Sequence, residues 1–150
     1  MALIRNSVVI RCTPEEAFDY LSDLRAELEW NPACKVMEKL TDGPVGLSTR
    51  YRAKWDKSPV VELEIVAYDR PHTWTGHNAG AIEVTFTGRL TEVSGGTRLE
   101  TEFEPVAHGW FRLVFPIFLW LMRREERANM EHIRTVLERR VGVSTGGGHG

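Results

Sequence analysis

Hydrophobic and polar residues alternate through the middle of the chain, residues 33–106, and clusters of turn-forming residues divide this region into short segments. In the segment STRYRAKW, Thr49, Tyr51, Ala53 and Trp55 share one face, and basic residues occupy the other. A period of two is typical of strands with one buried face. The turn signals TDGPVG, DKSP, DRP, NAG and SGG leave six such segments. The region is therefore predicted to form six antiparallel strands in a strongly curved or half-closed sheet.

The last two of these segments are predicted to pair as a hairpin around Gly95 and Gly96. Their alternation places charged residues on one face, among them Arg98 and Glu100. The opposite, dry face carries Ile82, Val84, Phe86, Leu90, Leu99, Thr101 and Phe103. In the segment VELEI the residues Val61, Leu63 and Ile65 are predicted to belong to the same dry face.

The N-terminal segment is predicted to form a strand around residues 7–12 followed by two short helices. Thr13 precedes Pro14, and Glu16 stands three residues after Thr13, which is the pattern of a capped helix start. The segment SDLRAELEWNP then indicates a second short helix that ends before Pro32.

The C-terminal segment begins with an almost unbroken apolar run, residues 110–122, and continues as a charged helix to Val141. At about 100° per residue its apolar side chains form one stripe, which is predicted to cover the dry face of the sheet. The stripe consists of Phe115, Phe118, Leu119, Met122, Met130, Ile133, Val136 and Leu137. Pro116 either begins this helix or kinks a longer one. Arg127 with Glu131, and Arg134 with Glu138, have the i,i+4 spacing of a solvated surface.

Two groups of residues depart from this stripe. Glu126 and Asn129 lie near its middle, which predicts either a buried polar pair or a water-containing cavity between helix and sheet. A second group, Leu113, Ile117, Trp120 and Leu121, points away from it. These four either pack under the preceding loop or form an exposed patch that serves as a dimer face, a membrane-touching portal or a lid.

Composition and charge favour a single globular domain and argue against nucleic-acid binding. A chain of 150 residues, 42% hydrophobic and 27% charged, is typical of one globular domain. The net charge of −2 argues against nucleic acid as a partner. The N-terminus has no pattern of a secretory leader, and the apolar run is too short to cross a bilayer, so a cytoplasmic location is expected. Cys12 and Cys34 are expected to be small apolar fillers, which fits a reducing compartment.

Motifs for metal, cofactor or nucleophilic chemistry are absent from the sequence. His72 and His77 differ in parity and would face opposite sides of one strand, while His108 and His132 have no partner at i,i+4. There is no glycine-rich phosphate loop and no GxSxG motif. We therefore expect no metal and no cofactor.

Three local motifs resemble those of the START-like superfamily, also called SRPBCC, and in particular its polyketide cyclase/dehydrase-like members. These are VVIRCTPEEAFDYLSD at the first strand and helix, WNP at Trp30 to Pro32, and GGTRLE at the turn into the last strand. In GLSTRYR, Leu47 and Ser48 stand where a second glycine is frequent in the family. The resemblance implies an α+β helix-grip fold, in which a curved antiparallel seven-stranded sheet wraps around a long C-terminal helix and two short helices follow strand 1. Residues 1–141 would form this domain, and residues 142–150 a flexible Gly-rich tail.

The resemblance also implies a cavity between sheet and C-terminal helix for a hydrophobic small molecule such as a lipid, isoprenoid or polyketide. The leading hypothesis is therefore sequestration, transport or presentation of such a ligand. One alternative is an aldol cyclase or dehydratase with Glu126 as acid/base and Asn129 or Tyr51 orienting a carbonyl. Another is a protein- or membrane-interaction module that uses the apolar back of the C-terminal helix. The candidate ligand-binding residues are Tyr51, Trp55, Leu63, Trp74, Phe86, Thr101, Phe103, Phe118, Met122, Glu126 and Asn129.

Overall fold

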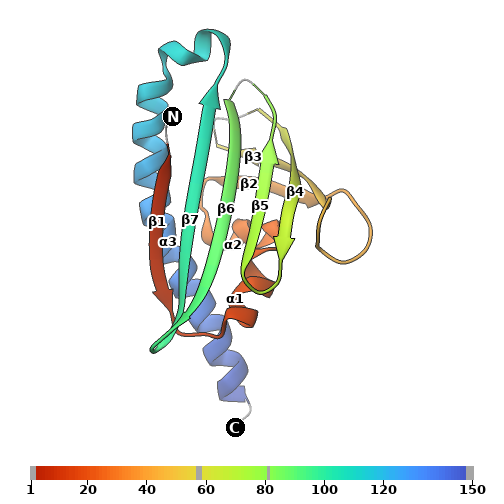
Figure 1. Cartoon of the computed structure of the whole chain (residues 1–150), viewed down its shortest axis with the longest axis vertical. Coiled ribbons are helices and arrows are strands. Elements are labelled where there is room, and N and C mark those ends of the chain that lie inside the picture. The colour runs from red at the N-terminus through yellow and green to blue at the C-terminus, as the bar shows by residue number, and fades with distance from the viewer. Residues whose placement is uncertain (1–2, 57–58, 81, 148–150) are drawn as a thin grey trace.

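One seven-stranded antiparallel sheet forms the body of the protein, and one long helix, α3, runs along it (Figure 1). The computed structural model describes residues 3–56, 59–80 and 82–147. The strand order is β1-β7-β6-β5-β4-β3-β2, so β1 and β2 are the two edges. The strands are β1 (Ile4–Ile10), β2 (Cys34–Lys39), β3 (Arg50–Trp55), β4 (Val61–Asp69), β5 (Thr73–Asn78), β6 (Ile82–Val93) and β7 (Gly96–Ala107). The predicted α+β helix-grip fold is confirmed.

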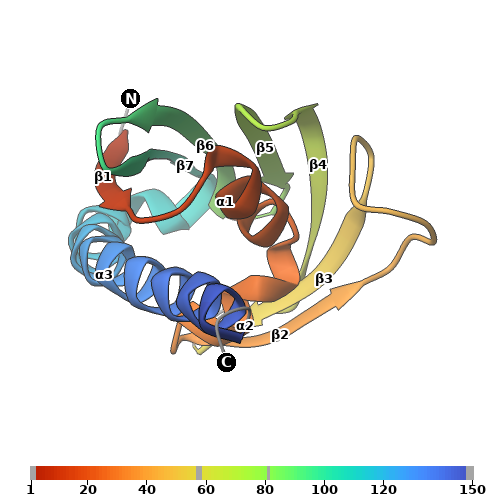
Figure 2. The ribbon, with the colours of Figure 1, turned by 90° about the horizontal axis from the view of Figure 1, so that it is seen from below.

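The register of the sheet confirms the predicted inner and outer faces. In the β6–β7 hairpin Phe86 pairs with Phe103, and Leu90 pairs with Leu99. Thr101 is buried on the same face, while Arg98 and Glu100 are exposed on the other. Figure 2 shows the strands following an open curve, with α3 (Phe115–Gly147) running along the gap between the two edges.

The two helices after β1 form for the local reasons that the sequence indicates. In α1 (Pro14–Leu21) the Thr13 side chain accepts a hydrogen bond from the backbone of Glu16, and the Glu16 side chain accepts one from the backbone of Thr13. The second helical segment is a 3₁₀ turn, η1 (Leu24–Ala26), followed by a single turn of α-helix, α2 (Glu27–Trp30). α1 packs against β6 and β7, and α2 packs against β2 and α3. Together they cover one end of the curved sheet.

Aromatic and aliphatic side chains form a buried core at this end of the molecule. Phe18 of α1 meets Trp74 of β5 edge to face, with ring centroids 5.6 Å apart. Leu99 of β7 and Leu137 of α3 are almost completely buried in the same core. Burial also raises the pKa values of the two free thiols, Cys12 to about 11 and Cys34 to about 12, so both are protonated at neutral pH.

The C-terminal segment departs from the prediction at both ends. A 3₁₀ helix, η2 (Gly109–Leu113), precedes α3, and Pro116 lies in the first turn of α3, so it begins the helix rather than kinking a longer one. α3 also continues to Gly147, past the predicted end at Val141, and residues 148–150 of the predicted tail lie outside the described residues.

The ion pairs on α3 differ from the two i,i+4 pairs that the spacing indicates. Glu131 pairs with Arg134 rather than with Arg127, because their side chains meet at i,i+3. Glu138 instead accepts a hydrogen bond of 2.9 Å from the backbone N–H of Arg11. Arg127 is therefore left without a carboxylate partner within the part of the chain that the structure describes.

The turn before β3 has a left-handed residue at the position where the resemblance leads us to expect a second glycine. Ser48 has a φ of 70°, in the left-handed region where glycine carries no steric penalty. Its N–H donates to the carbonyl of Ile65 at 2.8 Å. This hydrogen bond fixes the approach of the chain to β3 and offsets the cost of the left-handed conformation.

Candidate functional site

Two neighbouring rows of residues run across the inner face of the sheet. In the first row Trp74 pairs with Gly88, Gly88 with Thr101, and Thr101 with Asn6. In the second row Gly76 pairs with Phe86, Phe86 with Phe103, and Phe103 with Ile4. The register therefore brings Trp74, Phe86, Thr101 and Phe103, which were predicted from the sequence as ligand-binding residues, onto one continuous surface.

The first row carries polar atoms that have no partner. The Trp74 side chain lies over Gly88, where an added Cβ would stand 2.4 Å from the indole ring. Trp74 Nε1 and Asn6 Nδ2 are both buried without a hydrogen-bond partner in the described structure. Thr101 Oγ1 donates to the Met130 sulfur at 3.9 Å, which places this row beside α3. Two buried donors on one row are unusual, because a buried N–H without a partner costs free energy.

The second row and the first turns of α3 form an apolar surface that solvent still reaches. The Phe86 and Phe103 rings are 4.6 Å apart, and Phe86 also meets Trp74 edge to face at 6.1 Å. Phe86, Phe103, Phe118 and Met122 are all half-buried, although the sheet register and the helix stripe turn each of them inward. We call these four residues the upper wall. Side chains near α1 are thus buried in the core, whereas the inward-facing side chains at the opposite end remain partly exposed to solvent.

Glu126 lies on the buried stripe of α3, one turn after Met122. Its side chain is only 8% exposed, and Oε2 has no hydrogen-bond partner in the described structure. Burial, with smaller contributions from the charges of Glu27 and Glu125, raises its pKa to about 8, while Asn129 opposes the shift. Glu126 is therefore mostly a neutral carboxylic acid at pH 7. Among the described residues, no basic side chain pairs with the Glu126 carboxyl group.

A second carboxyl group, Glu27, was not among the predicted site residues. It lies on α2, which packs against α3, and its Oε1 accepts hydrogen bonds of 2.7 Å from both Trp55 Nε1 and Asn31 Nδ2. Burial raises its pKa above the usual range, whereas the two hydrogen bonds lower it. The only sequence signal is the four-residue spacing between Glu27 and Asn31, which is common on helix surfaces and does not indicate a site.

Of the other predicted site residues, Tyr51 and Leu63 are packed in the core, whereas Asn129 lies beside Glu126. Tyr51 is completely buried, and its hydroxyl donates to Asp23 Oδ1 at 3.4 Å, on the η1 side. Leu63 is 8% exposed on β4, opposite Tyr51 in the register. Asn129 is buried one turn beyond Glu126, with its Oδ1 3.4 Å from His132 Nδ1. The structure therefore brings Asn129 to Glu126, as the sequence predicted, whereas Tyr51 is held by Asp23.

The four histidines among the described residues lie outside the sheet interior. His77 Nε2 is 2.6 Å from Glu83 Oε2, and His108 Nε2 is 3.1 Å from Glu83 Oε1, so two distant histidines share one carboxylate. Hydrogen bonds from both rings lower the pKa of Glu83. His72 lies in the turn before β5 rather than on the strand, because the strand begins at Thr73. No group of three or more potential ligand side chains in residues 3–56, 59–80 and 82–147 is arranged to hold a metal ion.

The predicted apolar back of the C-terminal segment, with Leu113 at the end of η2 and the other three residues on α3, is exposed, which overturns the alternative that it packs under the preceding loop. Leu113 is 84%, Ile117 66%, Trp120 60% and Leu121 45% exposed. Trp110, in η2, adds a further exposed ring that stacks on Phe111 at 4.1 Å. We call Trp110, Leu113, Ile117, Trp120 and Leu121 the apolar patch.

The sequence matches the family described as polyketide cyclase/dehydrase and lipid transport over residues 1–138. The chain belongs to this family. The match extends from the start of the chain to the last turns of α3, so it includes both rows of the sheet, α2 and Glu126. It agrees with the resemblance to SRPBCC proteins that the opening strand and helix carry. None of the curated proteins matches the sequence.

Solved structures of other proteins share the fold of this family member. TTHA0849 from Thermus thermophilus superposes with a TM-score of 0.73 at 16% identity, covering 91% of this chain and 97% of that protein. MLL2253 from Mesorhizobium loti gives 0.70 at 17% identity, with coverages of 92% and 98%. SA2116 from Staphylococcus aureus, titled a protein of unknown function, gives 0.72 at 11% identity, with coverages of 94% and 96%. At these identities the likeness shows a common fold.

Within the described residues, none of the helices has the length and apolar character needed to span a membrane.

Proposed function

We propose that the protein binds a hydrophobic small molecule that carries a polar group, between the upper wall and the first row of the sheet. The observation that carries the proposal is the combination of inward-facing apolar side chains that solvent still reaches with buried polar atoms that lack partners. The family description, which names lipid transport and polyketide chemistry, supports the same class of ligand. The role of the family member would be to sequester, transport or present this molecule.

The polarity of the site indicates which ligands it would accept. Phe86, Phe103, Phe118 and Met122 offer rings and a thioether to an apolar body. Trp74 Nε1 is a donor without a partner, and Glu126 is a neutral acid that both donates and accepts. A carbonyl or hydroxyl group on an otherwise apolar ligand would satisfy these atoms. A ligand with a permanent charge would be disfavoured, since Glu126 provides no fixed counter-charge while protonated.

Replacement of Met122 by glutamate is expected to weaken binding of an apolar probe, N-phenyl-1-naphthylamine, by about tenfold or more, because a charge enters the upper wall. The probe's fluorescence increases in apolar surroundings, so a titration gives the dissociation constant. The matched control is Leu121→Glu, which places the same charge on the adjacent, 45% exposed residue. Equal affinities for the wild type and both variants would contradict the proposal.

A second candidate function is cyclisation or dehydration of a polyketide-like substrate, and the raised pKa of Glu126 favours it. In a dehydration, the carbon next to the carbonyl loses a proton to a base, and the hydroxyl leaves as water after receiving a proton from an acid. Glu126, with a pKa of about 8, would supply the proton near neutral pH. Asn129, one turn away, would orient the carbonyl, and the half-buried Glu27 would provide the second carboxyl group.

Glu126→Gln separates the two candidates. If the protein is an enzyme, the variant should lose turnover of a β-hydroxyketone by about a hundredfold, followed as formation of the absorbing enone, while it retains affinity for N-phenyl-1-naphthylamine. Glutamine keeps the shape and hydrogen-bonding capacity of the protonated acid but cannot transfer its proton. Undiminished turnover in the variant, or no turnover by the wild type, would count against the enzymatic candidate and leave binding alone.

A further inference from the structure

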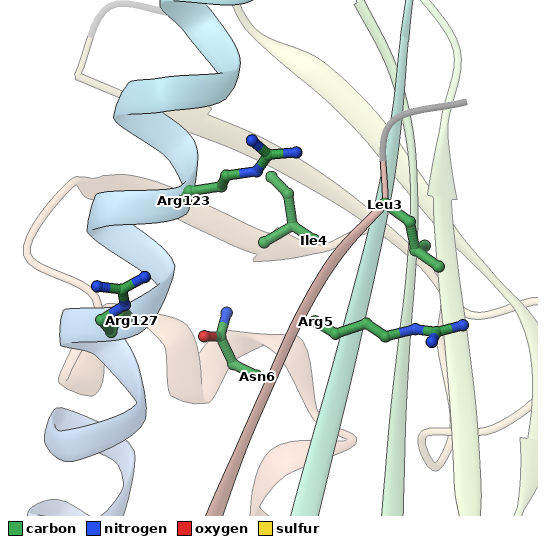
Figure 3. Close-up of a pocket in the computed structure, with 6 residues that line it drawn as sticks. All are labelled: Leu3, Ile4, Arg5, Asn6, Arg123 and Arg127. Carbon is green, nitrogen blue, oxygen red and sulfur yellow. The ribbon is translucent and has the colours of Figure 1, made fainter.

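The pocket between the edge strand β1 and α3 is lined by two apolar residues, three arginines and Asn6 of the first row, whereas the upper wall and Glu126 do not contribute to it. Its volume is about 430 Å³, and its lining residues are Leu3, Ile4, Arg5, Asn6, Arg123 and Arg127. In Figure 3, Ile4 and Asn6 project from β1 toward the helix, and Arg123 projects from the helix toward the strand. Leu3 and Arg5 project to the other side of β1.

The charges around this pocket are not balanced. Of the acidic groups nearby, Glu102 pairs with Arg5 at 3.5 Å and with Arg89 at 2.8 Å, and Glu131 pairs with Arg134. Arg123 and Arg127 take part in none of the ion pairs or hydrogen bonds among the described residues. Asn6 Nδ2, which is buried, also has no acceptor there. Two guanidinium groups and the Asn6 amide N–H therefore line one space, and no carboxylate among the described residues pairs with either guanidinium. Guanidinium and amide N–H groups are donors that bind phosphate.

Three residues of the apolar patch, Ile117, Trp120 and Leu121, lie on α3, the helix that carries Arg123 and Arg127. Trp120 stands three residues before Arg123 and seven before Arg127, so at 3.6 residues per turn these side chains occupy neighbouring positions of one flank. Arg124 stacks over the Trp120 ring at 5.8 Å. Between Glu104 and Glu125 the sequence contains three arginines and no acidic residue. Exposed tryptophan and aliphatic side chains bordered by arginine are typical of surfaces that lie in the interface of an anionic bilayer.

We propose that this region docks on a membrane containing anionic phospholipid: the apolar patch enters the interface, and the pocket between β1 and α3 takes the phosphate of a lipid headgroup. The donor set of the pocket and the absence of acidic residues from the patch match the charge of such a surface. A second copy of this chain would bring the same arginines together and repel, so charge complementarity favours lipid over a homodimer through the patch.

Vesicle cosedimentation tests the proposal with the full chain. The wild type is expected to bind vesicles containing phosphatidylglycerol more tightly than vesicles of phosphatidylcholine alone. The double variant Arg123→Gln, Arg127→Gln is expected to lose this preference by about tenfold or more, since each arginine near an anionic surface contributes to affinity. Ile117→Ser, Leu121→Ser is expected to weaken binding to both kinds of vesicle. All four positions are exposed, so these variants should keep the stability of the wild type in urea unfolding.

The control is Arg98→Gln, Arg139→Gln, which removes two exposed charges at the opposite end of the molecule and should leave vesicle affinity within about twofold of the wild type. Equal losses in this control and in the pocket variant would overturn a phosphate site, because general charge attraction would then explain binding.

No binding of wild type to either vesicle would overturn docking. Pocket-dependent binding of glycerol phosphate without vesicle binding would assign the site to a soluble phosphate ester and overturn the lipid. A dimer abolished by Ile117→Ser, Leu121→Ser, without vesicle binding, would assign the patch to a second copy.

Discussion

Gly88→Ala is expected to destabilise the protein by about 3 kcal/mol or more, the range of a badly overpacked core. An alanine Cβ at this position would stand 2.4 Å from two carbon atoms of the Trp74 ring. Trp74 has little freedom to move away, because Phe18 and Phe86 contact its ring from other sides and its side chain is only 1% exposed. Urea unfolding of the variant and the wild type measures the difference in the free energy of unfolding.

The matched control for this substitution is Gly76→Ala, on the strand that carries Trp74. An added Cβ there would first meet Leu24 at 3.8 Å, an ordinary contact, so the variant should lie within about 1 kcal/mol of the wild type. Combining Gly88→Ala with Trp74→Leu should recover part of the loss, because the shorter side chain leaves room for the methyl group. Similar effects of the two glycine substitutions would contradict the packing described for the first row.

Stability is expected to fall as the pH rises from about 4.5 to about 8 because of Glu126. The pKa of Glu126 in the folded protein is about 8 against a usual value of 4.5, so the folded state binds this proton more tightly than the unfolded chain does. The stabilisation is therefore complete below about pH 4.5 and is lost as the pH rises through about 8. Glu126→Gln should remove this decline, and the two unfolding free energies should converge at low pH. The difference above pH 8 is at most roughly 5 kcal/mol.

Unfolding curves in urea at intervals from pH 5 to pH 9 measure this dependence. Glu92→Gln serves as the control, since Glu92 is an exposed carboxylate on β6 and its replacement should leave the pH profile of the wild type unchanged. A decline in stability that is equally steep in Glu126→Gln and in the wild type would show that Glu126 is ionised in the folded protein at neutral pH. The description of the site as a neutral, partly unpaired acid would then be wrong.

Much of the fold follows from local patterns in the sequence. Period-two alternation identified the strands and their inner faces, since a half-buried strand permits no other order of side chains. The capping residues Thr13 and Glu16 located α1. The same method assigned Trp74, Phe86, Thr101 and Phe103 to one face, and the register then placed them in two adjacent rows.

Contacts between distant segments could not be predicted in the same way. The pairing of Glu27 with Trp55 and the convergence of His77 and His108 on Glu83 depend on the curvature of the sheet and the position of α2. The phosphate-site candidate depends on the placement of β1 beside α3, elements more than a hundred residues apart in the chain. Periodicity reports which face a side chain occupies, but the partner across that face is determined by tertiary packing.

Native mass spectrometry of freshly purified protein, compared with spectra after denaturation, is the decisive test of ligand binding in the interior. Such binding predicts that the native wild-type spectrum shows one apolar ligand bound per chain. This ligand should be released on denaturation and can be identified by extraction. The fraction of chains that carry this ligand should be lower in Met122→Glu and unchanged in Leu121→Glu. Spectra of the wild type that remain ligand-free under gentle conditions, even after incubation with N-phenyl-1-naphthylamine, would contradict a binding role for the upper wall.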